Sequence, residues 1–267
     1  MIRKWTCLAA FGVCGLVFAD VSAAQDMMRH IDLSSPDMVS AEMTRAEVET
    51  VLAAATAASP ADFTGKKLSG LDLSGLDLSG AVFRAARLNK TNLKRAKLDA
   101  AVLDQAWLLE ADLRQASLKG ANIFAAQMQR ALLDEADLSG ARLAADLTGA
   151  SLVDALLVGA NLGADMRNQS MGLMRAVLKS AKLDRANLRG ADLSRVDLEF
   201  ASLKSADLTG ASLKGATLGG ADLTGATIIG TDFAGADVTS TRLIAPVGLE
   251  AARNLDQARN LQRLLKD

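Results

Sequence analysis

Large apolar residues recur at every fifth position over most of this chain. In the stretch AKLDRANLRGADLSR, residues 181–195, leucines stand at 183, 188 and 193, each with alanine two residues before it. An α-helix repeats about every 3.6 residues and a strand every second residue. Five-residue steps would therefore scatter the leucines around a helix, or send them alternately to both faces of a strand. Neither element explains the spacing, so each five-residue unit must contain a bend of its own.

The period of five extends over two long runs. It holds from Phe63 to Leu143 and again from Leu173 to Leu243, with one residue missing near Ala144 and one extra residue between Leu162 and Leu173. Within a unit, the central residue and the alanine two before it are predicted to point inward, and the other three positions outward. Glycine often closes the unit, where a bend favours positive φ. Self-similarity at a fixed period indicates a solenoid whose coils stack about 4.8 Å apart.

Units such as ADLTG (206–210) and ANLRG (186–190) follow the pattern A-(D/N)-L-x-x. This pattern, over residues 61 to about 245, resembles the pentapeptide-repeat family. The resemblance implies an all-β fold, a right-handed quadrilateral β-helix of about nine coils with four units in each coil. It also implies a largely bacterial family that is united by its fold and has no shared activity. Some of its members protect DNA topoisomerases by mimicking duplex DNA.

The segments on either side of the repeat predict short helical caps. Thr44-Arg45-Ala46-Glu47 is a capping-box pattern, so we expect a helix over about 44–57 within an N-terminal cap segment, residues 25–60. This helix would cover the first coil, because the ends of a solenoid expose backbone and leucines. After the repeat, residues 246–267 predict a C-terminal helical cap, with a helix from about residue 255.

Residues 1–24 read as a secretory signal peptide. Arg3 and Lys4 precede an apolar run over 5–19, and small residues at 21–24 allow cleavage after Ala23 or Ala24. The alternative is a membrane anchor, but about 15 apolar residues are short for a bilayer. We therefore expect a periplasmic or secreted protein with no stable membrane insertion after cleavage.

Cleavage would also remove both cysteines, Cys7 and Cys14, so no disulfide or cysteine metal site is expected. The full chain has 30 basic and 31 acidic residues. Residues 1–24 hold two of the basic and one of the acidic residues, which leaves a mature net charge of −2. That balance does not predict a nucleic-acid partner.

Catalytic groups are poorly represented. His30 is the only histidine, which excludes a histidine triad or a multi-histidine metal site within one chain. Carboxylates such as Asp72 and Asp134 fall at outward positions, and no phosphate-binding loop is present. We therefore predict no enzyme activity and no cofactor. Methionines form two groups, Met27 and Met28 with His30, and Met166, Met171 and Met174. Thioethers could bind Cu(I) in an exported protein, although packing is the favoured interpretation.

The second irregularity, residues 163–175, predicts a bulge or loop on one face of the solenoid. Loops on rigid scaffolds often carry function. Its candidate residues are Met166, Arg167, Asn168, Met171 and Met174.

Apolar side chains at outward positions give the strongest candidate site. Assigning units to four sides in rotation places Arg87 and Trp107 one coil apart in one ladder, and an exposed tryptophan beside arginine and aliphatic residues is typical of a partner-binding anchor. The alternative is that the N-terminal segment folds over this surface. The candidate partner-binding residues are Arg87, Val102, Trp107, Leu109, Phe124, Leu132, Val153, Leu156 and Val158.

These observations predict an exported, non-catalytic scaffold that presents its outer faces to a protein partner, and that could form a homo-oligomer. Two alternatives stay open: a DNA-mimicking protein that protects topoisomerases, and a periplasmic copper-binding protein.

Overall fold

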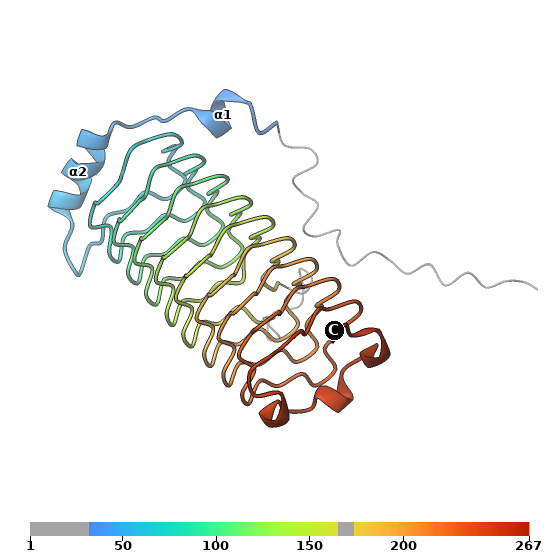
Figure 1. Ribbon diagram of the computed structural model, residues 1–267. Helices are drawn as coiled ribbons and strands as arrows, with labels where there is room; N and C mark the ends of the chain where they lie inside the picture. The colour runs from blue at the N-terminus through green and yellow to red at the C-terminus, as the bar shows by residue number, and fades with distance from the viewer. Residues whose placement is uncertain (1–31, 165–173, 267) are drawn as a thin grey trace, which may run out of the picture. The chain divides into compact units, whose positions relative to one another are not determined.

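The computed structural model describes residues 32–164 and 174–266, and in these ranges the chain forms a right-handed four-sided β-helix (Figure 1). The helical elements are α1 (Pro36–Val39), α2 (Arg45–Ala54) and three 3-10 turns, η2 (Leu249–Ala251), η3 (Leu255–Gln257) and η4 (Leu261–Arg263). In the described ranges, β-structure consists of isolated one-residue bridges, nearly all parallel, rather than longer strands. None of the helices in these ranges is long and apolar enough to span a bilayer.

The bridges define four ladders, which we call sides A, B, C and D, formed by the residue just before each apolar centre. Side A contains Asp62, Val82, Val102, Asn122, Arg142, Asn161, Asp192, Ser212, Asp232 and Arg253. Side B contains Lys67, Arg87, Trp107, Gln127, Asp146, Val177, Asp197, Thr217, Asp237 and Arg259. Side C contains Asp72, Asn92, Asp112, Leu132, Ser151, Lys182, Ser202, Asp222, Arg242 and Leu265. Side D contains Asp77, Lys97, Ser117, Asp137, Leu156, Asn187, Asp207, Thr227 and Val247. Coils are numbered from the first member of each ladder, which gives nine complete coils and three sides of a tenth.

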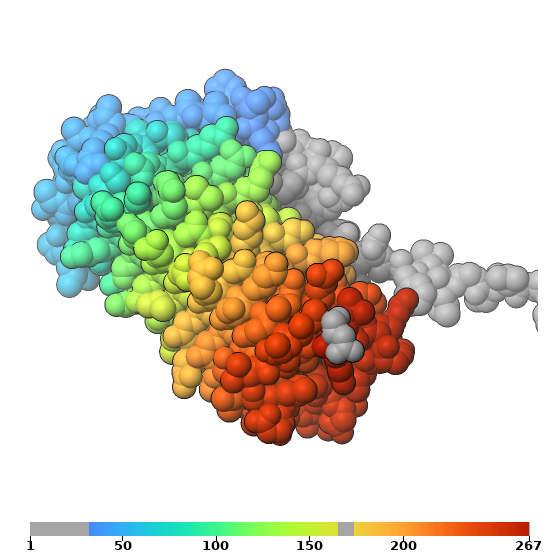
Figure 2. Space-filling view, viewed as in Figure 1, coloured from blue at the N-terminus to red at the C-terminus, as the bar shows by residue number. Residues whose placement is uncertain are grey.

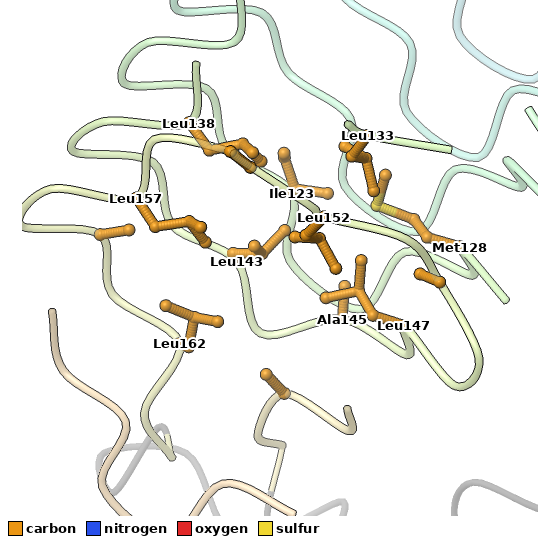
Figure 3. Close-up of a cluster of buried hydrophobic side chains, with 14 of the residues drawn as sticks. Ile123, Met128, Leu133, Leu138, Leu143, Ala145, Leu147, Leu152, Leu157 and Leu162 are labelled. Atoms are coloured by element: carbon orange, nitrogen blue, oxygen red, sulfur yellow. The ribbon is translucent and has the colours of Figure 1, made fainter. Parts of the chain in front are cut away.

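The centres fill the interior. In coil 4, Ile123, Met128, Leu133 and Leu138 come one from each side, point toward one another and are fully buried (Figure 3). Where alanine stands two residues before a centre, as it does in most units, it is buried as well and leaves room for these larger side chains. The inward placement of the two apolar positions in each unit is thus the one that the period of five predicts.

Outward polar residues satisfy the backbone at the bends. Asp137 on side D accepts a hydrogen bond at 3.0 Å from the N–H of Ser139, two residues on. Where serine takes the ladder position, the acceptor comes from the coil before: Asp99 Oδ1 accepts from the Ser117 hydroxyl (2.5 Å) and from the Lys119 N–H (3.0 Å). The Asp, Asn and Ser residues of the repeat therefore cap turns.

Two irregularities interrupt the register. Gln127 bridges to Asp146, a spacing one residue short of the regular twenty, as predicted near Ala144. Asp146 bridges to Val177, a spacing of 31, so the second irregularity holds eleven extra residues and the expectation of one extra residue was wrong. The predicted centre at Leu173 lies outside the described residues. The N–H of Ala176 donates to the carbonyl of Leu162 at 3.1 Å, which closes the insertion between sides A and B of coil 6.

The predicted C-terminal helix is replaced by a partial coil. Bridge residues recur every sixth position at Val247, Arg253, Arg259 and Leu265, and a 3-10 turn follows each of the first three. Asn254 and Asn260 precede two of these turns with φ of 55° and 60°. A left-handed residue at every sixth position interrupts an α-helix. The alanines and leucines at every third position from Ala252 to Leu264 pack against the core at the end of the stack instead.

At the other end, α2 covers the first coil (Figure 2). The Thr44–Glu47 capping box is formed, and the helix ends at Ala54, earlier than the predicted residue 57. Val48 is buried in the core cluster, while Arg45 donates to the carbonyls of Asp72 (3.0 Å) and Ser74 (3.2 Å).

Residues 32–43, which we call the strap, lie against side B. The Glu42 N–H donates to the carbonyl of Lys67 at 2.8 Å, and the Lys67 ammonium contacts Asp37 at 2.6 Å. Met38 of α1 is 4% exposed although it lies outside the main core cluster. The strap therefore covers part of the outer surface of coils 1 and 2.

Candidate docking surfaces

The nine predicted partner-binding residues do not form one surface. The structure divides them between two diagonally opposite corners of the solenoid. We call the first group the A/B patch, formed by Arg87, Val102, Trp107, Leu109 and Phe124. We call the second group the C/D patch, formed by Leu132, Val153, Leu156 and Val158.

The A/B patch occupies coils 2–4. Arg87 and Trp107 are bridge partners on side B, as the rotation of sides predicts, and Val102 and Phe124 belong to side A. All five residues of the patch are half-buried. The guanidinium of Arg142 lies over the Phe124 ring, with Cζ 4.1 Å from the ring centroid. The patch thus combines aromatic faces with cationic side chains, a composition enriched at protein interfaces.

The strap lies next to this patch. Asn89 Nδ2 donates to the carbonyl of Met38 at 3.0 Å, and Asn89 Oδ1 accepts from the N–H of Leu109 at 3.0 Å. One buried side chain therefore joins the strap to a backbone group of the A/B patch. Sequence analysis leaves open that the N-terminal segment folds over this surface, but it does not predict this contact. A non-repeating segment carries no register from which its place on the solenoid could be derived.

The C/D patch is more exposed. Leu132, Leu156 and Val158 are 36%, 41% and 40% exposed, and Val153 is half-buried. At the corner between Val153 and Leu156, Asp154 forms a two-pronged ion pair with Arg185, at 2.8 and 2.7 Å.

Of the candidate residues in the insertion, Met166, Arg167, Asn168 and Met171 lie outside the described residues, and Met174 is half-buried. The described end of the insertion is anchored through Arg175. Its guanidinium donates to the carbonyl of Arg195 at 2.8 Å and lies 3.7 Å from Asp197.

Charged groups on the outer faces pair along the stack. On side D, Lys119 lies 3.2 Å from Asp137 and Arg189 lies 3.1 Å from Asp207. Burial raises the pKa of Asp137, but hydrogen bonds from Ser139 and Lys119 outweigh it, so this pKa lies below its ordinary value of 3.8. The same balance, with Thr209 and Arg189, lowers the pKa of Asp207. These carboxylates are held ionised, which suits turn caps and ion pairs rather than acid catalysis.

In residues 32–164 and 174–266, a shallow hollow of about 220 Å³ lies between coils 1 and 2 and is lined by Ser74, Gly75, Asn92, Lys94 and Arg95. In the same ranges of the chain, His, Cys, Asp and Glu form no group of three that could hold a metal ion. The features that stand out are the two apolar patches.

Comparisons with known proteins concern the repeat. A family profile described as pentapeptide repeats matches in eight copies, over residues 61–99, 96–140, 124–168, 173–210 and 206–243. A search of curated proteins gives no significant match.

Several solved structures are similar. HetL, a pentapeptide repeat protein involved in heterocyst differentiation regulation in the cyanobacterium Nostoc sp. strain PCC 7120, is 29% identical over 84% of this chain and 95% of its own, with a TM-score of 0.26. QnrB1, a plasmid-mediated fluoroquinolone resistance protein, is 20% identical over 66% of this chain and 89% of its own, with a TM-score of 0.31. A thylakoid-lumen pentapeptide repeat protein from Arabidopsis thaliana is 26% identical over 49% of this chain and 66% of its own, with a TM-score of 0.14. TM-scores this low do not support a functional assignment.

Proposed function

Because the chain belongs to the pentapeptide-repeat family, in which a shared fold carries no shared activity, we propose its function from its surface: a non-catalytic scaffold that binds a protein partner through the A/B patch. The observation that carries this proposal is the position of Trp107 at an outward ladder position beside Arg87 and Leu109. Tryptophan and arginine supply a large share of the binding energy at protein interfaces.

Protection of a topoisomerase by DNA mimicry is the weaker alternative. A surface that imitates duplex DNA has to present a continuous row of negative charge, because DNA carries one phosphate about every 1.7 Å of its axis. On side D, acidic residues alternate with basic ones and pair with them, as in Lys119–Asp137 and Arg189–Asp207. Such pairing favours a protein partner without a strong charge. The copper-binding alternative rests on two groups of residues: Met27, Met28 and His30, and Met166, Met171 and Met174. Of these residues the structure describes Met174, which is half-buried.

We further propose that the protein acts in the periplasm or outside the cell. The support is the sequence of residues 1–24, with its basic start, apolar run and small residues before Ala23 and Ala24. Mass spectrometry of the protein recovered from the periplasmic fraction tests this. A mature N-terminus at Ala24 or Gln25 is expected, and a full-length chain confined to the cytoplasm would refute export.

The partner is tested by crosslinking in periplasmic extract. The unchanged protein is compared with a Trp107→Glu, Leu109→Glu variant. Phe200→Glu serves as the control because Phe200 is 69% exposed at the bend after side B in coil 7, four coils away from Trp107. All three proteins are first checked for equal thermal unfolding. We expect the same crosslinked species with the unchanged protein and with Phe200→Glu, and at least about a tenfold loss with the double variant, since each anchor contributes about 1–2 kcal/mol or more. Equal capture by all three would refute docking at the A/B patch.

A further inference from the structure

Side D has an apolar pair at its midpoint. Its ladder has nine members, and the fifth is Leu156, with four members before it and four after it. Leu156 and Val158, two residues on, are 41% and 40% exposed. Coil 5 thus places two aliphatic side chains side by side on the outside of side D, halfway along its length.

The charges on either side of this pair are arranged in opposite order. Lys119 of coil 3 and Asp137 of coil 4 come before it, and Arg189 of coil 6 and Asp207 of coil 7 come after it. From coil 5 toward coil 3, the negative charge of Asp137 comes first and the positive charge of Lys119 second. From coil 5 toward coil 7, the positive charge of Arg189 comes first and the negative charge of Asp207 second. The face is therefore complementary to itself when it is turned end over end.

This order distinguishes two ways of pairing the face with a copy of itself. In a parallel pair each coil faces its own equivalent, so Lys119 would oppose Lys119 and Asp137 would oppose Asp137. In an antiparallel pair about coil 5, coil 4 faces coil 6 and coil 3 faces coil 7. Asp137 then opposes Arg189, and Lys119 opposes Asp207. The outer coils bring no like charges together, because coil 2, with Lys97 and Asp99, faces the uncharged Thr227 and Ile229 of coil 8. Coil 1, with Asp77, faces the uncharged Val247 and Leu249 of coil 9.

We propose that side D binds a second copy of this chain, antiparallel, with the two-fold axis passing at Leu156. A two-fold contact brings the same surface of both copies together, so residues on the axis meet themselves. Leu156 and Val158 form the apolar centre of the contact, and the two charge pairs of one copy meet the reversed pairs of the other. Complementary charges set the register and direction of such a contact more than its affinity.

The face is open for this contact. In coils 1–8 the bend after side D carries glycine, except at Ala100; the glycines are Gly80, Gly120, Gly140, Gly159, Gly190, Gly210 and Gly230. Because φ is positive at these bends, glycine is favoured there, and over coils 1–8 the edge has no side chain larger than a methyl group. The strap lies on side B, opposite side D, and the described ends of the insertion lie between sides A and B.

The position of Leu156 also gives the contact its full length. The nine ladder members are separated by eight steps of about 4.8 Å and therefore span about 38 Å. A narrow face needs that length, because stable interfaces bury at least about 1,200 Å² in total. An antiparallel pair centred on the fifth of nine members overlaps along the whole face.

The first experiment measures mass in solution by light scattering after gel filtration. We expect the full chain to be a dimer at micromolar concentration, and Leu156→Glu, Val158→Glu to be a monomer with unchanged thermal unfolding. Phe200→Glu, which also changes an exposed apolar residue, should stay dimeric. A monomeric unchanged protein at about 0.1 mM, or a dimeric Leu156→Glu, Val158→Glu variant, would overturn the proposal.

The second experiment tests direction, using ladder residues of side D in a background with Cys7→Ser and Cys14→Ser. A short bis-maleimide crosslinker is used, because facing β-layers pack about 10 Å apart, beyond the reach of a disulfide. Leu156→Cys should crosslink to itself. Lys97→Cys and Thr227→Cys should each fail to do so alone, yet crosslink when the two proteins are mixed, since coil 2 faces coil 8. Self-crosslinking of Lys97→Cys and Thr227→Cys as strong as that of Leu156→Cys would refute the antiparallel pair. These results do not depend on the partner of the A/B patch, which lies at the diagonally opposite corner from the C/D patch.

Discussion

The side-chain amide of Asn89 donates to the carbonyl of Met38, 51 residues earlier in the chain, at 3.0 Å. The oxygen of the same amide accepts from the N–H of Leu109 in the next coil. A single buried side chain thus holds the strap and caps a bend of the solenoid.

Replacement of Asn89 by alanine should release the strap. The change leaves a backbone donor and a backbone acceptor without their partner, which costs about 1–3 kcal/mol. Hydrogen exchange measured by mass spectrometry should show faster exchange in residues 36–42 and at Leu109, with little change in coils 7–9. Asn187→Ala is the control, because Asn187 caps only the exposed N–H of Arg189. Strap exchange equal in the two variants would contradict the role of Asn89.

Two neighbouring leucines should respond very differently to truncation. Leu157 is fully buried, whereas Leu156 is 41% exposed on side D. Leu157→Ala is expected to lower the free energy of unfolding by about 2–5 kcal/mol through lost burial and a cavity. Leu156→Ala should change the stability of the monomer by about 0.5 kcal/mol or less. Urea unfolding at low protein concentration measures both, and comparable losses would mean that the alternation of inward and outward positions is not as described.

Acid should destabilise the solenoid through its turn-capping aspartates. Burial raises the pKa of Asp222, but hydrogen bonds from Thr224 and the charge of Lys204 outweigh it, and the pKa lies below 3.8. A carboxyl whose pKa is lower in the folded state contributes stability above its unfolded pKa, and loses it as the pH falls through its folded value. The free energy of unfolding should therefore fall as the pH drops through the unfolded pKa near 3.8 toward the lower folded value.

The Asp222→Asn variant isolates the contribution of this one carboxylate to the acid sensitivity. Asparagine keeps an oxygen that can cap the turn, but it cannot titrate. Urea unfolding at neutral pH and at about pH 3 should show a shallower pH dependence for this variant. A slope as steep as that of the unchanged protein would exclude Asp222 as a source of the acid sensitivity.

Glycines at the bends should differ in their tolerance of a side chain. A Cβ added at Gly248, where φ is 76°, would meet Ile229 Cγ1 at 2.2 Å. A Cβ added at Gly140, where φ is 66°, would meet nothing within 4 Å. Gly140→Ala should therefore cost about 1–2 kcal/mol for the left-handed backbone alone. Gly248→Ala should cost more and increase hydrogen exchange in residues 249–265, the partial tenth coil. Equal stability of the two variants would contradict the close approach of Ile229.

Much of this fold is predictable from the sequence because its physical cause is local. The period of five decides which residues point inward, and the missing residue near Ala144 shortens one bridge spacing on each of the four sides from twenty to nineteen without changing the sides that follow. The C-terminal turns were not predictable in the same way. Asparagine, as at Asn254 and Asn260, occurs in helices as well as in left-handed turns, and apolar residues at every third position fit either conformation.

The insertion shows the limit of periodicity. Leu173 falls on a plausible five-residue register, yet Val177 is the residue that continues side B. The bridges across the insertion, such as the one between Asp146 and Val177, are all spaced 31 residues apart and reveal how many residues leave the stack. The candidate surfaces have the same limit: the sequence lists outward residues, but the division into two opposite corners depends on counting sides across every coil.

The pairing of opposite charges along side D also bears on how fast the protein meets its partners. Lys119 with Asp137 and Arg189 with Asp207 form short dipoles whose fields cancel beyond about one Debye length, near 8 Å in physiological salt. With a formal net charge of −1 for the whole chain, little long-range attraction is left to accelerate an encounter. Association should therefore proceed at about 10⁵–10⁶ M⁻¹s⁻¹ and vary little with ionic strength. Selectivity would then arise after collision, in how long a correctly matched complex lasts.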